Sequence, residues 1–333
     1  MITLESTAGL GITVLPYGAT WASCRVPMGD GTTREVLLGC PDETAYRTHS
    51  TYLGATIGRF ANRLRNARLH IDGADYALDA NDGRHCLHGG QNGFGRREWA
   101  IEELAASRVR LSIASPDGDG GFPGQMTAEA IYSVAGDDLS VTIEYLAAVD
   151  RPCPVSLTNH AYFNLDGDGV DARRHTLQLA SERFLPIDAD GLPRGPIETV
   201  RGSPFDFTTP AALDCAPESH PQLQLNRGYN HAFLLDSRCR DLAIPAAELV
   251  SSDGRLALQM FTSLPALQLY GGNYIAGTSA RAGGSYADYA GVALEAEFPP
   301  DSPHYPEWPE TDCILRPGSV YRQRIRYRFV VRC

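Results

Sequence analysis

The sequence predicts an all-β protein, a large antiparallel β-sandwich with only short helical turns. Apolar and polar residues alternate with a period of two in many segments, and turn-rich pieces separate those segments. No stretch carries the apolar pattern of an amphipathic helix over four turns. Many half-buried strands joined by long connections favour two packed sheets. Because no repeat or linker-like segment interrupts the chain, we expect residues 1–333 to form a single domain.

The clearest alternation lies at the end of the chain. One face of the expected strand carries Tyr321, Ile325, Tyr327, Phe329 and Val331, and the other carries Arg322, Arg324, Arg326, Arg328 and Arg332. The segments 109–113 and 139–145 alternate in the same way. One apolar and one polar face is typical of an antiparallel sheet packed on one side, so we expect the arginines to face solvent.

The composition limits the class of partner. Hydrophobic residues make up 43% of the chain, yet no apolar run approaches the roughly 20 residues that span a membrane. A net charge of -11 without a concentrated basic run argues against nucleic acid, anionic membranes and heavily phosphorylated ligands. Residues 1–19 lack a basic leader and a continuous apolar core, so we expect a first strand and a cytoplasmic protein. The eight cysteines form no C-x-x-C pair and are expected to be free thiols.

Motifs for cofactors and metals are missing. The sequence has no G-x-S-x-G elbow, no Walker A motif and no H-E-x-x-H motif. The segment 167–172 has dinucleotide-like glycine spacing, but two aspartates there would repel a pyrophosphate. His85 and His88 flank Cys86 without a second ligand cluster of comparable spacing. The chemistries that depend on these motifs are therefore set aside.

Segment 155–165 is the most informative. Interpreted as one strand, it places four polar side chains on a single face: Thr158, His160, Tyr162 and Asn164. A polar face on an aromatic-rich strand is typical of a cleft wall. The alternative is a structural histidine bonded to a neighbour, which four aligned polar residues make less favourable.

A second strand, 292–298, places Glu295 and Glu297 on one face. Two neighbouring carboxyl groups tend to raise one pKa, which suits a general base working near neutrality, whereas exposed glutamates are the alternative. In segment 265–270, Gln268 and Tyr270 share a face, and both side chains are good partners for sugar hydroxyls.

Two further segments, GRFANR at 58–63 and LHGG at 87–90, embed polar residues in tightly bending chain. Arg59 in the first is interpreted as structural, in an ion pair with an acidic neighbour.

Taken in order, these segments resemble the aldose 1-epimerase (galactose mutarotase) family. The matching pieces are GRFANR at 58–63, CLHGG at 86–90, PCPVSLTNHAYFNLDG at 152–167, GYNHAF at 228–233, PALQLYGGN at 265–273 and ALEAEFPPDSPHYPEWP at 293–309. The resemblance spans nearly the whole chain. It implies a galactose mutarotase-like supersandwich, no metal or organic cofactor, and interconversion of the α and β anomers of hexoses such as galactose or glucose.

The resemblance also implies roles for individual residues. His160 would be the acid that protonates the ring oxygen, and Glu295 the base that removes the anomeric hydroxyl proton. The residues that would hold the sugar are Asn62, Arg63, His88, Tyr162, Asn230 and Gln268, with His88 also polarising the ring oxygen. The family usually has Asp where this chain has Asn230, so we expect an altered epimer preference or a weaker hold on the sugar.

Three other functions stay open from the residues. A glycoside hydrolase would use a pair of carboxyl groups roughly 5 to 9.5 Å apart, and would give His160 no required role. A non-catalytic carbohydrate-binding or regulatory protein on the same fold would not need both His160 and Glu295. A hexose-6-phosphate epimerase relative would need a basic cluster at the site. We expect a free aldose as the partner and a monomer or homodimer.

Overall fold

The computed structural model describes residues 1–214, 216–309 and 312–332. Two α-helices occur in these ranges, α1 (Glu43–Thr48) and α2 (Pro221–Leu225), and each has fewer than two turns. The 3₁₀ turns are Arg65–Ala67, Phe94–Arg96, Asp119–Gly121, Ala172–Arg174, Pro217–Ser219, Ser237–Cys239 and Ser302–His304. Neighbouring strands in the sheets pair antiparallel, so the predicted all-β fold with only short helical turns is confirmed.

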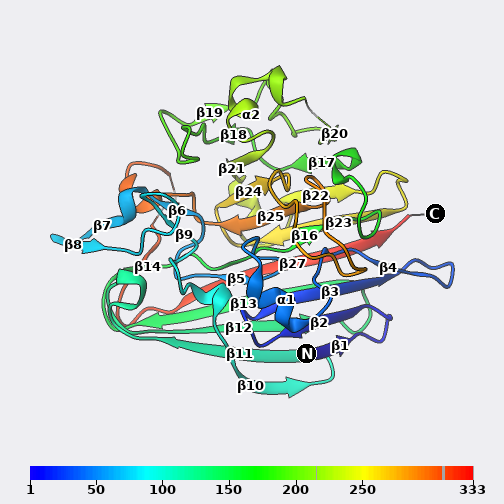
Figure 1. Ribbon diagram of the computed structural model, residues 1–333, viewed down its shortest axis with the longest axis horizontal. Helices are drawn as coiled ribbons and strands as arrows, with labels where there is room; N and C mark the ends of the chain where they lie inside the picture. Colours follow the sequence, from blue (N-terminus) through cyan, green and yellow to red (C-terminus); the bar gives the residue numbers. More distant parts are fainter. Residues whose placement is uncertain (215, 310–311, 333) are drawn as a thin grey trace.

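The largest sheet has nine strands. In spatial order they are β10 (Ala100–Ala105), β11 (Arg108–Ser115), β12 (Met126–Val134), β13 (Ser140–Val149), β27 (Tyr321–Val331), β23 (Leu256–Thr262), β22 (Ala247–Val250), β17 (Thr176–Leu179) and β20 (Ala211–Ala212). In β27 the predicted alternation is confirmed: Tyr327 and Ile325 are fully buried while Arg324 is exposed and pairs with Glu144 of β13 at 2.8 Å. The long strands β11, β12, β13 and β27 run side by side in the lower half of Figure 1.

Two smaller sheets complete the sandwich. The six-stranded sheet consists of β16 (Tyr162–Phe163), β25 (Val292–Glu297), β24 (Ala266–Tyr270), β21 (Asn230–Leu234), β18 (Arg183–Phe184) and β19 (Glu198–Thr199). The four-stranded sheet consists of β1 (Ile2–Glu5), β2 (Gly11–Leu15), β3 (Thr20–Pro27) and β4 (Thr33–Glu35). Two-stranded pairs join β14 (Cys153–Pro154) to β26 (Ile314–Leu315), β15 (Thr158–Asn159) to β5 (Thr56–Ile57), β6 (Arg63–Leu64) to β9 (Cys86–Leu87), and β7 (Arg68–Ile71) to β8 (Ala74–Ala77).

Aromatic side chains join the three large sheets. Trp21 of β3, Phe163 of β16 and Tyr327 of β27 meet with ring centroids 5.0 to 5.9 Å apart, and all three are buried. Burying a large aromatic side chain stabilises a fold by about 1.5 to 3 kcal/mol, before any ring-pairing contribution. This packing holds the edge strand β16, and with it the part of the polar segment 155–165 that follows His160, against a rigid core.

The prediction of one continuous strand over 155–165 is wrong. The chain forms β15, which pairs with β5, and then β16, which pairs with β25, so it changes partner at His160 and Ala161. The Asn159 side chain accepts a hydrogen bond from the Ala161 backbone N–H at 3.0 Å and stabilises the bend. A period-two pattern cannot reveal such a change of partner, because each short piece still alternates.

Arg59 is structural, as predicted, but its partners are not acidic. Its guanidinium is buried and donates hydrogen bonds to the Ser115 hydroxyl and to the carbonyl oxygens of Ser115, Pro116, Pro123 and Gly124 at 2.8 to 3.1 Å. The expected ion pair with an acidic neighbour is therefore replaced by a set of backbone acceptors. These bonds tie the GRFANR segment to the turn that follows β11.

The cysteines that the structure describes are free thiols, as predicted. Those six, Cys24, Cys40, Cys86, Cys153, Cys239 and Cys313, are all buried. Cys215 and Cys333 lie outside the described residues. Within the described ranges, no helix has the length and apolar character needed to cross a bilayer.

Candidate active site

All eight predicted site residues border one cavity of about 230 Å³. They are Asn62, Arg63, His88, His160, Tyr162, Asn230, Gln268 and Glu295. The residues come from separate parts of the chain: the GRFANR turn, the LHGG turn, the bend between β15 and β16, and strands β21, β24 and β25. The convergence of these distant segments on one cavity supports the sequence-based selection. Of the polar face predicted on 155–165, only His160 and Tyr162 border the cavity, while Asn164 donates to the Val170 and Ala290 carbonyls.

His160 and Glu295 face each other in this cavity. Nε2 of His160 lies 3.5 Å from Oε2 of Glu295, and both side chains are more than nine-tenths buried. Burial lowers the pKa of His160 to about 4 and raises the pKa of Glu295 to about 8, the second effect being opposed by the charge of Arg63. At neutral pH the imidazole is therefore neutral and the carboxyl keeps its proton, so the pair holds one proton.

Aromatic rings fix the orientation of His160. Its imidazole stacks on Tyr162 with ring centroids 4.9 Å apart, and meets the ring of His88 edge-on at 5.4 Å. The backbone N–H of His160 donates to the Ala55 carbonyl at 2.9 Å. Ring and backbone contacts together hold Nε2 toward Glu295.

A row of amide side chains forms a second wall of the cavity. Gln268 of β24 stands opposite Glu295 in the strand register, which places both side chains on one face of the sheet. The Gln268 amide donates to Oδ1 of Asn230 at 2.7 Å, and Asn230 in turn donates to Oδ1 of Asn226 at 3.3 Å. The row carries no charge, so it can offer both donors and acceptors to hydroxyl groups.

His88 is held by the backbone of Asn62. The Asn62 N–H donates to Nδ1 of His88 at 3.1 Å, and the Asn62 carbonyl accepts from the His88 N–H at 3.0 Å. Burial lowers the pKa of His88 well below its ordinary value, so the ring is neutral and carries its proton on Nε2. His88 thus presents one N–H donor that its own scaffold does not use.

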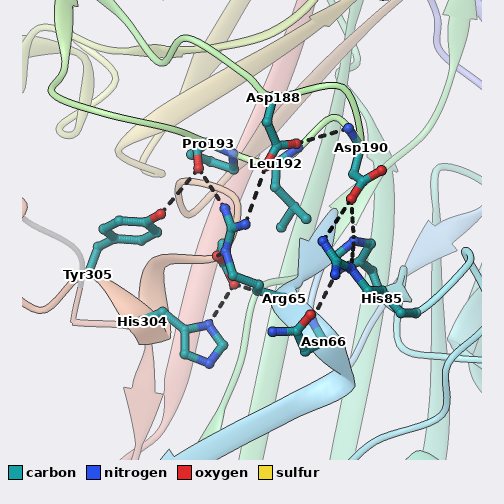
Figure 2. Close-up of polar contacts among 11 residues, drawn as sticks. Arg65, Asn66, His85, Asp188, Asp190, Leu192, Pro193, His304 and Tyr305 are labelled. Atoms are coloured by element: carbon teal, nitrogen blue, oxygen red, sulfur yellow. Dashed lines mark hydrogen bonds and ion pairs between the residues drawn. The ribbon is translucent and has the colours of Figure 1, made fainter.

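Arg63 and the turn behind it are braced by ion pairs. Arg63 donates from Nε to Asp82 at 2.7 Å. Figure 2 shows the neighbouring network, in which Arg65 reaches Asp188 and the Pro193 carbonyl. His85, drawn in the same view, accepts from the Asn66 N–H through Nδ1. Its Nε2 lies 3.2 Å from Oδ2 of Asp190. The loop 185–195 is therefore fastened to the turn that carries Asn62 and Arg63.

Comparisons with known proteins identify the family of this chain. A family model described as aldose 1-epimerase matches residues 1–328. The chain belongs to the aldose 1-epimerase family. It is 42% identical to the aldose 1-epimerase of Escherichia coli K12, over 99% of this chain and 95% of that protein. It is 33% identical to the galactose mutarotase of Rattus norvegicus, over 97% of this chain and 92% of that protein.

Solved structures of relatives have the same fold. The crystal structure of a GalM/aldose epimerase homologue from C. elegans superposes with a TM-score of 0.91 at 31% identity, over 99% of this chain and 98% of that one. That of galactose 1-epimerase from Lactobacillus acidophilus gives a TM-score of 0.83 at 28% identity, over 99% and 93% of the two chains. The predicted galactose mutarotase-like fold is confirmed.

Sequence reasoning missed several cavity residues. Tyr52 meets the His88 ring edge-on at 4.8 Å, and Ser50, Thr51, Asn226 and Tyr274 also line the cavity. Apart from Tyr274, just past the PALQLYGGN segment, they lie in loops outside the family-matching segments, where no periodic pattern marks a side chain as facing a site. Among the described residues that line it, a larger hollow of about 670 Å³ along β17, β18 and β22 has no histidine and no tyrosine, so we favour the smaller cavity.

Several buried polar atoms at the cavity lack a hydrogen-bond partner within the described chain. They are Nδ1 of His160, Oε2 of Glu295, Oε1 of Gln268 and Nδ2 of Asn226. Leaving a buried polar atom unpaired costs about 1 to 3 kcal/mol, so such atoms concentrate where a ligand will satisfy them. The ligand atoms of His88, His160 and Glu295 also lie within 4.8 Å of one another, a spacing that could accommodate a metal ion. The expectation of a metal-free site stays a prediction.

Proposed function

We propose that this protein is an aldose 1-epimerase that interconverts the α and β anomers of a free hexose such as galactose or glucose. The observation that carries the proposal is the buried His160–Glu295 pair, 3.5 Å apart, in which burial lowers the pKa of the imidazole and raises the pKa of the carboxyl group. Ring opening at the anomeric carbon needs a proton on one oxygen and the loss of a proton from another oxygen on the same carbon. A closely spaced acid and base match that requirement.

In this mechanism His160 and Glu295 together hold one exchangeable proton at every step. With the proton on Nε2 of His160, the imidazolium protonates the ring oxygen while the Glu295 carboxylate accepts the anomeric hydroxyl proton. The C1 to O5 bond breaks, the open aldehyde forms, and the pair is left as neutral imidazole and neutral carboxylic acid. This is the form that the pKa values favour in the free protein.

Ring closure reverses the transfers. After rotation about the C1 to C2 bond, His160 removes the proton from the C5 hydroxyl and Glu295 returns its proton to the carbonyl oxygen. The other anomer results, and the pair again holds one proton. In this proposal Asn62, Arg63, Tyr162, Asn230 and Gln268 hold the sugar hydroxyls, and the Nε2–H of His88 polarises the ring oxygen.

The alternatives fit the cavity less well. A glycoside hydrolase would set two carboxyl groups roughly 5 to 9.5 Å apart around the bond, whereas Glu295 faces an imidazole. A sugar phosphate would need several cations, and Arg63, already paired with Asp82, is the single cation among the described residues that line the cavity. A binding protein would have no use for a buried acid and base with shifted pKa values.

Polarimetry tests the proposal. Freshly dissolved α-D-glucose or α-D-galactose should lose optical rotation faster with the protein than in buffer, and EDTA should leave the rate unchanged because the mechanism uses no metal. The protein is proposed to act in the cytoplasm as one domain, as a monomer or homodimer. No acceleration on either sugar by folded protein would favour the sugar-binding function instead.

A further inference from the structure

Glu297 is a buried carboxyl group that the mechanism above does not use. It is the last residue of β25, two positions after Glu295, and its side chain is inaccessible to solvent. Its strand partner on β24 is Ala266, which offers no polar group. No ion pair joins Glu297 to a cation among the described residues. A carboxylate without a cation is costly to bury, so this position needs an explanation.

One hydrogen bond connects Glu297 to the site. Oε1 accepts from Nδ2 of Asn62 at 3.0 Å, while Oε2 is buried without a partner in the described chain. Asn62 is the same residue whose backbone holds both His88 Nδ1 and the His88 N–H. Asn62 also adopts a left-handed conformation with φ of 64°, which is uncommon for a residue other than glycine and needs support from its surroundings.

We propose that Glu297 is a positioning residue that works as a neutral carboxylic acid, holding Asn62 and through it His88, while leaving Glu295 as the carboxyl of β25 that exchanges a proton with substrate. This inference rests on the proposed function. The carbonyl oxygen of the acid accepts from the Asn62 amide, and the absence of charge spares Glu295 the repulsion of a second anion two residues away.

The charged surroundings agree with a neutral Glu297. Burial raises the pKa of Glu297 well above its ordinary value, and the neighbouring Glu295 raises it further. The Asn62 hydrogen bond and the charge of Arg63 on β6 act in the opposite direction. Arg63 is already bonded to Asp82, so its charge is shared.

The first test is the pair Glu297→Ala and Glu297→Gln. Alanine removes the acceptor for Asn62, so kcat/KM for mutarotation should fall at least tenfold with native circular dichroism. Glutamine keeps a neutral acceptor of the same shape and should restore most of that loss. A glutamine variant as inactive as the alanine variant would mean that an ionised carboxylate is needed, and would overturn the proposal. So would full activity of the alanine variant.

A double-mutant cycle tests the route through Asn62. If Glu297 acts on the site through Asn62, the double variant Asn62→Ala/Glu297→Ala should lose about as much activity as the worse single variant. Losses that multiply would mean that the two residues act independently, which contradicts the proposed chain from Glu297 to His88.

The second test does not depend on turnover. Infrared difference spectra at pH 7 should contain a protonated-carboxyl band that Glu297→Gln removes, separate from the band that Glu295→Gln removes and that disappears near pH 8. If Glu297→Gln leaves the protonated-carboxyl region unchanged, Glu297 is ionised and the proposal fails. This result would stand even if polarimetry showed no mutarotation, so the failures of the two proposals can be told apart.

Discussion

Arg59 and Glu295 are both buried ionisable residues, and they differ in how their polar atoms are satisfied. The Arg59 guanidinium has acceptors on every side, four of them backbone carbonyls. Around Glu295, by contrast, one carboxylate oxygen and the nearby atoms His160 Nδ1 and Gln268 Oε1 have no partner in the described chain. A buried polar group whose hydrogen bonds are all made within the protein is typical of a structural residue. Buried polar atoms that lack hydrogen bonds and border a cavity are typical of a binding site.

The largest effect is expected on activity, when His160 or Glu295 is replaced. Glu295→Gln and His160→Asn should each lower kcat about 10²- to 10⁴-fold, because each removes a group that we propose to transfer a proton. Polarimetry with purified variants that have native circular dichroism measures the loss. Turnover retained by both variants would refute the assignment of acid and base.

Glu295→Gln should also gain stability while it loses activity. The folded pKa of Glu295, about 8, exceeds its ordinary value of 4.5, so the folded state binds a proton that the unfolded state releases. Stability is thus unaffected below pH 4.5, declines as the pH rises toward 8, and stays reduced above it. The variant should melt several degrees higher than the wild type at pH 8 and equally at pH 4. A lower melting temperature at pH 8 would contradict this.

Replacing Arg59 should lower the stability of the protein, whereas replacing Glu295 should raise it. Arg59→Met leaves several buried carbonyl oxygens without donors and should lower the free energy of unfolding by about 3 to 5 kcal/mol, measured by urea denaturation. The matched control is Arg316→Met, since Arg316 makes an exposed pair with Asp72 that is worth at most about 1 kcal/mol. If both variants lost the same free energy of unfolding, Arg59 would be no more structural than an exposed arginine, and its contrast with Glu295 would fail.

The pH dependence of kcat should follow the shared proton. Below about pH 4 His160 gains a second proton and the pair loses its acceptor, and above about pH 8 Glu295 loses the proton that the pair shares. We expect a broad maximum between these values, with a fall of up to tenfold per pH unit outside it. Activity that still rises above pH 9 would exclude a one-proton mechanism.

The smallest effect is expected in the amide row. Asn230→Ala removes the acceptor of Gln268 and one proposed contact to the sugar, and should raise KM about tenfold with kcat within about threefold of wild type. Asn230→Asp keeps the acceptor, so its KM should return to within about threefold of the wild-type value. A kcat effect larger than the KM effect would place Asn230 in the chemistry itself.

Much of this protein could be predicted from its sequence. The alternation in segments such as 321–331 determined the strands and their buried faces, because a side chain in a strand can point only to one side or the other. Family-matching segments identified eight residues that all border one cavity. Each of those segments is a short run of neighbouring residues, so it can be recognised in the sequence without knowledge of the fold.

Other features depended on the tertiary structure. The bend at His160 exists because β15 and β16 pair with different strands, and no local pattern reports a pairing partner. The same holds for Tyr52 and Asn226, which reach the cavity from loops, and for the carbonyl partners of Arg59. The pKa values of His160 and Glu295 are likewise set by burial and by groups distant in sequence. Residue type and spacing determined which chemical groups were available, and long-range packing decided how far burial shifts the pKa of each group.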